Sequence, residues 1–164
     1  MSTDLSLRQA RETLVREHMA DENTLSFDKV LATFPHPHYE IIPTGARYDG
    51  RTEVNDYYTD SRLAFPDQRN ELISLRHSDD AVIVEFWLRG THLGPFRALP
   101  ATGNTFECQM TAFFIFDGEQ LVCERVYFDS MTILKQLLAG TSLRRPGSLL
   151  RLAKTLLGLR HGLR

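Results

Sequence analysis

Asp129 is the residue whose type and position best suit proton-transfer chemistry. It follows a strand-like segment at 120–128, which comes after the turn signal Asp117-Gly118. Such a pair is typical of a two-residue hairpin turn, so we expect Phe116 to lie opposite Glu119. In that register Asp129 ends an almost wholly apolar sheet face, whereas Glu124 lies on the more polar opposite face. The apolar face consists of Phe106, Cys108, Met110, Ala112 and Phe114 on one strand and Leu121, Cys123, Arg125, Tyr127 and Asp129 on the other.

A carboxyl group at the end of an apolar face can serve as an acid and a base. Removal from water raises its pKa toward the working pH, where it can accept a proton and return it. Two structural roles compete with this interpretation. Asp129 could cap a helix at 131–138, or it could pair with Arg125, which would lower its pKa and oppose general-acid use. Taken alone, the pattern favours a structural role.

His92 lies in a glycine-flanked strand end that we expect at the mouth of a pocket. As a neutral imidazole it could donate a hydrogen bond to a substrate carbonyl or hold Asp129 in position. A loop-ordering hydrogen bond to a backbone carbonyl is an equally good interpretation. The expected pocket is apolar, and its substrate-binding candidates are Trp87, Phe106, Met110, Arg125, Tyr127, Tyr58 and His38.

His36, His38 and Glu40 share one strand face if the chain is extended there, and this spacing resembles a set of metal ligands. No distant histidine or cysteine stands at ligand spacing, so we expect no metal and place His38 or Tyr39 at the pocket wall instead. The sequence also lacks a glycine-rich phosphate loop and a nucleophile elbow. We therefore expect a protein without a cofactor.

The predicted elements begin with helices and end with strands. Helices are expected at 4–20, 26–32 with Ser26 as the N-cap, and 51–65; a short strand is expected at 38–43; longer strands are expected at 70–76, 81–88, 105–116 and 120–128; a closing helix is expected at 131–138. This order predicts a segregated α+β fold rather than a βαβ sheet.

Length and charge set the outer limits of the interpretation. The 164 residues suit one domain at 1–140 with an extension at 141–164. The extension carries +6 and the net charge is −2, so the body carries −8, which argues against nucleic-acid binding.

Cys108 and Cys123 are expected as buried, reduced thiols. The start of the chain lacks a signal-peptide pattern, so we expect a cytoplasmic protein.

The extension itself predicts an amphipathic helix at 148–159, with a broad leucine-rich face opposite Arg151 and Lys154. Such a helix could lie on a membrane surface, form an arm of a dimer, or pack on the acidic body. We favour packing on the body or a dimer contact, because opposite charges attract.

Several short motifs together resemble the SnoaL-like polyketide cyclases of the nuclear transport factor 2-like superfamily. They are Tyr48-Asp49-Gly50-Arg51, Phe65-Pro66-Asp67, Gly90-Thr91-His92-Leu93-Gly94-Pro95-Phe96, Pro100-Ala101-Thr102-Gly103, Phe116-Asp117-Gly118 and Phe128-Asp129. The resemblance implies a cone-shaped, curved, antiparallel-rich sheet around helices, a homodimer, and neither metal nor organic cofactor. It also implies that Asp129 is the acid/base of an aldol ring closure. Arg125 departs from the pattern, since many relatives have Trp there.

Together these observations predict a cofactor-free lyase, isomerase or cyclase that transfers a proton next to a carbonyl group. Asp129 would be its acid/base and His92 an assisting donor, acting on a small apolar or polyketide-like molecule. The alternative is a non-catalytic ligand-binding or oligomerising module of the same fold.

Overall fold

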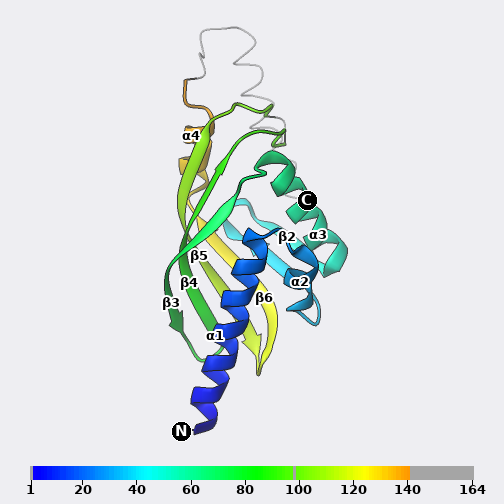
Figure 1. The fold of residues 1–164 in the computed structure, drawn as a ribbon, viewed down its shortest axis with the longest axis vertical. Coiled ribbons are helices and arrows are strands. Elements are labelled where there is room, and N and C mark those ends of the chain that lie inside the picture. The colour runs from blue at the N-terminus through cyan, green and yellow to red at the C-terminus, as the bar shows by residue number, and fades with distance from the viewer. Residues whose placement is uncertain (1, 98, 141–164) are drawn as a thin grey trace.

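The computed structural model describes residues 2–97 and 99–140 of the chain. A curved, unclosed sheet forms one layer, and helices from the first half of the chain lie against it (Figure 1). The predicted class, α+β with N-terminal helices and a curved sheet, is confirmed. The helix predicted at 148–159 lies outside the described residues.

The elements follow the predicted order, with one strand that the sequence did not indicate. They are α1 (Ser2–Asn23), α2 (Phe27–Ala32), β1 (His38–Ile41), the 3-10 turn η1 (Ile42–Thr44), β2 (Ala46–Asp49), α3 (Gly50–Ala64), β3 (Arg69–His77), β4 (Ala81–Thr91), β5 (Thr105–Asp117), β6 (Gln120–Phe128) and α4 (Ser130–Leu137). The additional strand is β2, a four-residue edge strand next to a turn at Gly45, where φ is +68°. Ser26 precedes α2 as predicted, but its side chain does not cap the helix.

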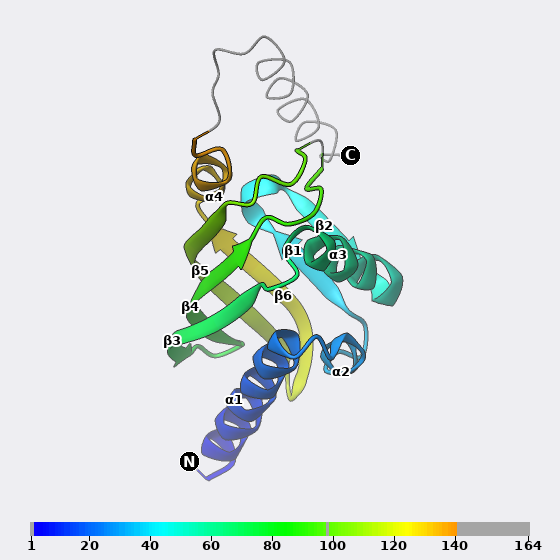
Figure 2. The same cartoon turned by 45° about the horizontal axis from the view of Figure 1, so that its top comes forward.

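The sheet has the order β2-β1-β6-β5-β4-β3, and its strands twist across the helices (Figure 2). All neighbouring strands are antiparallel except β1 and β6, which run parallel. The parallel contact joins the short β1–β2 hairpin to the long meander β3–β6. The inner face of β1 and β6 lies beneath the helices, because Tyr39 and Val126 belong to the same apolar core as Val15 of α1. Their outer face lies away from the helices.

Helix α1 is held on the sheet by both packing and hydrogen bonds. Val15 and Met19 belong to the main apolar core, which alternate residues of β4, β5 and β6 complete. Arg11 donates from Nε and Nη2 to the carbonyl oxygen of Gly118, at 2.8 and 2.7 Å, and from Nη1 to that of Asp79 at 3.0 Å. These bonds tie α1 to both hairpin turns at one end of the sheet, so its inner residues are fixed in position over β6.

The register of the β5–β6 hairpin differs from the prediction. Asp117 pairs with Gln120, not Phe116 with Glu119, and Val122 is an extra residue in β6. Beyond this β-bulge the pairing has shifted by one, so Phe114 faces Glu124. A shift of one residue moves every following side chain to the other face of a strand. Glu124 therefore points into the core, and Arg125 points outward.

Cys108 and Cys123 are both buried free thiols. Within residues 2–97 and 99–140, no helix has the length and apolar character that a membrane span requires.

Candidate functional site: a buried histidine–carboxylate cluster

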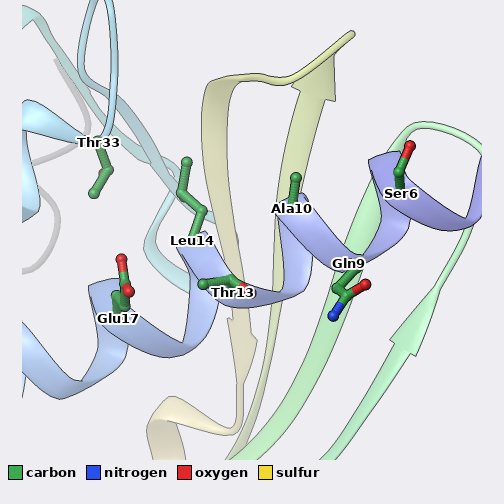
Figure 3. Close-up of a pocket in the computed structure, with 7 residues that line it drawn as sticks. All are labelled: Ser6, Gln9, Ala10, Thr13, Leu14, Glu17 and Thr33. Atoms are coloured by element: carbon green, nitrogen blue, oxygen red, sulfur yellow. The ribbon is translucent and has the colours of Figure 1, made fainter. Parts of the chain in front are cut away.

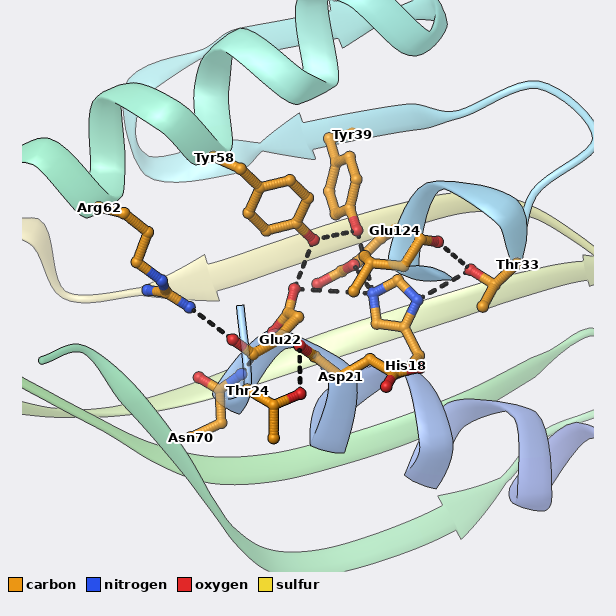
Figure 4. Close-up of polar contacts among 11 residues, drawn as sticks. His18, Asp21, Glu22, Thr24, Thr33, Tyr39, Tyr58, Arg62, Asn70 and Glu124 are labelled. Carbon is orange, nitrogen blue, oxygen red and sulfur yellow. Dashed lines mark hydrogen bonds and ion pairs between the residues drawn. The ribbon is translucent and has the colours of Figure 1, made fainter. Parts of the chain in front are cut away.

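Five ionisable or hydroxyl-bearing side chains meet in the interior between the helices and the sheet (Figure 4). His18 and Glu22 stand one turn apart on α1, so they share its inner side. Tyr39 and Glu124 are paired neighbours on β1 and β6. Tyr58 reaches them from the inner side of α3. We call these five residues the buried cluster. Its members come from two helices, α1 and α3, and from two strands, β1 and β6.

His18 is the centre of the cluster and is fully buried. Its Nδ1 lies 2.9 Å from Oγ1 of Thr33, and that hydroxyl donates to the carbonyl oxygen of Val30 at 2.6 Å. Because a hydroxyl has one hydrogen, Thr33 accepts from His18, and Nδ1 carries a proton. On the other side of the ring, Nε2 lies 3.0 Å from the Tyr39 hydroxyl and 3.3 Å from Oε2 of Glu124.

A chain of short hydrogen bonds runs from Tyr39 to Glu22. The Tyr58 hydroxyl donates to Oε1 of Glu22 at 2.5 Å, and the two tyrosine oxygens are 2.5 Å apart. Since Tyr58 gives its hydrogen to Glu22, Tyr39 must donate to Tyr58, and its own oxygen can accept from His18. The imidazole is thus connected through two phenols to a carboxylate, which is an unbroken path for a proton.

Glu22 is held in its charged form. Burial favours the neutral acid, but His18 and the hydrogen bond from Tyr58 outweigh it and lower the pKa of Glu22. Asn70 donates from Nδ2 to the second carboxylate oxygen at 2.5 Å, and Arg62 donates to the Glu22 main-chain oxygen at 3.2 Å. The carboxylate therefore has partners on both oxygens.

Glu124 has the opposite character. Burial raises its pKa, and the charge of Glu22 raises it further, while His18 only partly opposes this. Its Oε2 makes no hydrogen bond within the described residues, although His18 Nε2 lies 3.3 Å away. Burial also disfavours a charged His18, but Glu124 and Glu22 raise the pKa of His18 to about 9. Titratable neighbours whose environments separate their pKa values are a mark of acid/base sites.

An open hollow of about 480 Å³ lies along the flank of α1 (Figure 3). Thr33 lines it and also accepts the hydrogen bond from His18, so the hollow and the buried cluster share this residue. The lining residues are Ser6, Gln9, Ala10, Thr13, Leu14, Glu17 and Thr33. No member of the buried cluster is among them.

Asp129 lies outside the apolar interior, contrary to the prediction. It is exposed and caps α4, accepting from the backbone N–H of Met131 at 2.9 Å and from Oγ1 of Thr132 at 2.7 Å. Hydrogen bonds from Thr132 and Met131 lower its pKa. The capping alternative is therefore confirmed, and the pairing with Arg125 is wrong because Arg125 Nε binds Glu40 at 2.5 Å.

His92 is fully buried in a second apolar cluster, where its ring packs on Phe65 and Phe96. The backbone N–H of Thr102 donates to Nδ1 at 3.3 Å, and the Thr102 hydroxyl lies 3.0 Å from the same atom. Burial lowers the pKa of His92, which agrees with the expected neutral imidazole. Its contacts order the loop that follows β4.

The predicted substrate-binding residues do not form one site. Tyr58 belongs to the buried cluster, and Met110 to the main core around it. Phe106 packs with Phe65 in the second apolar cluster. The other four lie on the outer face: Trp87 under Arg89, Tyr127 against Phe113, Arg125 on Glu40, and His38 on Asp49.

The sequence-based prediction did not include His18, Glu22 and Glu124 as site residues. A signal for the first two was present, because histidine and glutamate four residues apart lie on the same side of α1 as Val15 and Met19. Glu124 was assigned to the outer face because nothing in the sequence marks Val122 as a bulge. Among the residues that the structure describes, two sets of side chains could hold a metal ion, with ligand atoms within 4.8 Å of one another: His18, Glu22 and Glu124, and also His38, Glu40 and Cys123.

Solved structures with this fold come from several bacteria. AclR of Streptomyces galilaeus matches with a TM-score of 0.68 and 19% identity, over 92% of this chain and 94% of its own. A candidate polyketide cyclase of Xanthomonas campestris matches with a TM-score of 0.72 and 19% identity, over 79% of this chain and 98% of its own. A protein of Catenulispora acidiphila with a ketosteroid isomerase-like fold, in complex with trimethylamine, matches with a TM-score of 0.65 and 16% identity. The match covers 76% of this chain and 91% of that protein. At these identities the likeness establishes the fold.

No curated protein matches the sequence. The model of the SnoaL-like polyketide cyclase family, however, matches residues 13–137, which contain every member of the buried cluster as well as Asp129. The chain belongs to the SnoaL-like polyketide cyclase family.

Proposed function

We propose that this protein is a cyclase or isomerase that moves a proton at a carbon next to a carbonyl group, and that the buried cluster carries the reaction. Family membership supports a cyclase- or isomerase-type function. The observation that carries the proposal is the opposite shift of two neighbouring carboxyl groups, since the pKa of Glu22 is lowered and that of Glu124 is raised. One group stays charged while the other can exchange a proton.

In this proposal Glu124 is the acid/base. Its carboxylate takes a proton from the carbon, and the electron pair of the broken C–H bond forms the enolate. The negative charge that develops on the carbonyl oxygen needs a hydrogen-bond donor, and protonated His18 can supply one. In an isomerisation the proton returns to a different carbon. In a ring closure the enolate carbon attacks a second carbonyl, whose oxygen then takes the proton.

The substrate must reach a closed interior. His18 is 0% exposed, Tyr39 1% and Tyr58 4%. Catalysis at Glu124 therefore requires one of the covering helices to move away from the sheet. The substrate class that suits the surroundings is a small, largely apolar ketone or polyketide-like molecule, because the cluster is set in an apolar core.

A non-catalytic ligand-binding module remains the second candidate, and the hollow beside α1 favours it. The hollow is open, it lies outside the buried cluster, and Thr33 connects the two. In that case the cluster would fix α1 to the sheet, and a ligand would be bound without being changed.

Solvent exchange separates these candidates without knowledge of the natural substrate. A panel of 1,3-diketones and aryl methyl ketones is incubated with the protein in deuterated water, and loss of the α-proton is followed by NMR. We expect enzyme-dependent exchange that Glu124→Gln reduces by about 10²–10⁴-fold, the usual worth of general acid–base catalysis.

Two variants complete this test. Glu119→Gln removes a carboxylate from the exposed turn before β6 and should leave exchange unchanged. Asp129→Asn examines the position that the family resemblance implied, and it should also keep its activity. Full exchange in Glu124→Gln together with loss in Asp129→Asn would return the acid/base role to Asp129.

We also propose that the protein is a homodimer, as the family resemblance implied. Support comes from apolar side chains left exposed on the sheet, with Tyr127 40% and Val122 37% exposed. Light scattering of the full chain tests this, and a monomeric mass would refute it.

A further inference from the structure

The outer face of the sheet carries two rows of polar residues where β2, β1 and β6 meet. In one row Glu40 stands between Arg47 and Arg125, its direct partners on the neighbouring strands. In the next row His38 pairs with Asp49 on one side, and Cys123 lies near it on the other. An imidazole, a thiol and a carboxylate are thereby gathered from two strands whose facing residues, such as Glu40 and Arg125, are 85 positions apart in sequence.

The imidazole is already oriented. Its Nδ1 lies 2.9 Å from Oδ1 of Asp49, and its Nε2 points the other way, 3.6 Å from Oε1 of Glu40. Histidines that bind metals usually give one ring N–H to a carboxylate, which fixes the other nitrogen toward the ion. His38 has this arrangement, and its side chain is 29% exposed.

The carboxylate of Glu40 is oriented as well. Arg125 donates from Nε to Oε2 at 2.5 Å, while Arg47 lies 3.7 Å from Oε1. Oε1 therefore points toward His38, and the Arg47 guanidinium lies 3.7 Å from it.

We propose that His38 Nε2, Glu40 Oε1 and Cys123 Sγ bind a divalent ion of the zinc type, with Asp49 as the partner that orients His38. Thiolate, imidazole and carboxylate are the ligands that zinc takes in proteins, at about 2.0–2.3 Å. Tetrahedral ligands at those lengths lie roughly 3.3–3.8 Å from one another. The His38–Glu40 separation already has this value, and the thiol is within 4.8 Å of both. Water can fill the fourth position.

The other set of ligand types, His18, Glu22 and Glu124, suits a metal less well. Both nitrogens of His18 have hydrogen-bond partners, and that set contains no sulfur. A histidine must lose its positive charge before it can bind a metal, and the two carboxylates around His18 oppose this.

An ion at His38 and Cys123 would join β1 to β6, the parallel pair on whose inner face Tyr39 and Glu124 stand. A bound ion would therefore stabilise the pairing of the two strands that carry Tyr39 and Glu124. The proposed site rests on the outer-face contacts alone and does not depend on the proposed function.

Cobalt(II) is the probe that tests this proposal, because a thiolate bound to it gives a charge-transfer absorption in the near ultraviolet. The reduced full-length protein is titrated with Co²⁺, and Zn²⁺ is then added as a competitor. We expect one equivalent of Co²⁺ to produce the absorption and Zn²⁺ to abolish it. Cys123→Ser should lose the absorption, whereas Cys108→Ser, which changes the other buried thiol, should keep it.

A variant at the exposed Asp49 keeps the test independent of folding defects. Asp49→Asn leaves all three ligands in place and should retain the absorption, with affinity weakened by about 10–100-fold. Circular dichroism confirms that each variant is folded. The proposal is overturned if the wild type gives no thiolate absorption, if Cys123→Ser keeps it, or if binding is lost on His18→Gln and not on His38→Gln.

Discussion

Glu124 and Asp129 are carboxylic acids five residues apart on one chain segment, and their surroundings give them opposite properties. Glu124 is 6% exposed, and burial raises its pKa. Asp129 is exposed at the start of α4, where hydrogen bonds from Thr132 and Met131 lower its pKa. A group that must both accept and donate a proton needs the first environment and not the second. Solvation and hydrogen bonding, rather than residue type, separate a candidate acid/base from a helix cap.

The largest effect on stability should come from breaking the interior site. His18→Leu removes the cation that Glu22 and Glu124 share, and leaves their carboxylates buried without it. Loss of one partner from a buried ion pair costs about 3–5 kcal/mol. Urea denaturation measures the change in the free energy of unfolding.

His77→Leu is the matched control, since His77 pairs with Glu12 at 3.2 Å nearer the surface. Its loss should be below about 1 kcal/mol. Equal losses in the free energy of unfolding would show that the interior ion pairs stabilise the protein no more than the pair nearer the surface.

The second prediction concerns alkaline pH. The pKa of His18 is about 9 in the folded protein against 6.5 for a free histidine. A raised pKa gives stability that is complete below pH 6.5 and is lost as the pH rises through 9. The shift corresponds to a loss on the order of 3 kcal/mol across this window. Urea denaturation from pH 6 to 10 should show the decline in the wild type.

The same series in His18→Gln should be flatter, because that side chain does not titrate. If the decline persists unchanged in His18→Gln, another group is responsible for it.

The smallest effect should come from the exposed carboxylate. Asp129→Ala removes the side chain that accepts from Met131 and Thr132, so the first turn of α4 should fray and stability should fall slightly. Asp129→Asn should keep the cap, because asparagine is an equally good N-cap residue. Thermal unfolding of both variants checks this, and a loss in Asp129→Ala that exceeds the loss in His18→Leu would reverse the comparison.

The sequence was sufficient for the fold and for most of its elements. Strands and helices could be predicted because hydrophobic period, Pro66 and the Asp117-Gly118 turn mark them locally. The inward position of Glu124 could not be predicted because it depends on one inserted residue in β6. The bulge at Val122 reverses the faces of β6, so the face assigned to Arg125 and Asp129 belongs to Glu124. The Cys123 thiol likewise joins His38 and Glu40 through the parallel β1–β6 pairing, which has no local signature.

Direct titration of the two carboxyl groups tests whether Glu124, and not Asp129, has the raised pKa that an acid/base group needs. Carbon-detected NMR of protein labelled at the side-chain carboxyls follows Glu124 and Asp129 in one sample, with Glu124→Gln and Asp129→Asn for assignment. We expect Glu124 to titrate above the ordinary glutamate value of 4.5 and Asp129 to titrate below the ordinary aspartate value of 3.8. A Glu124 that titrates at or below 4.5, beside an Asp129 raised above 3.8, would contradict this expectation.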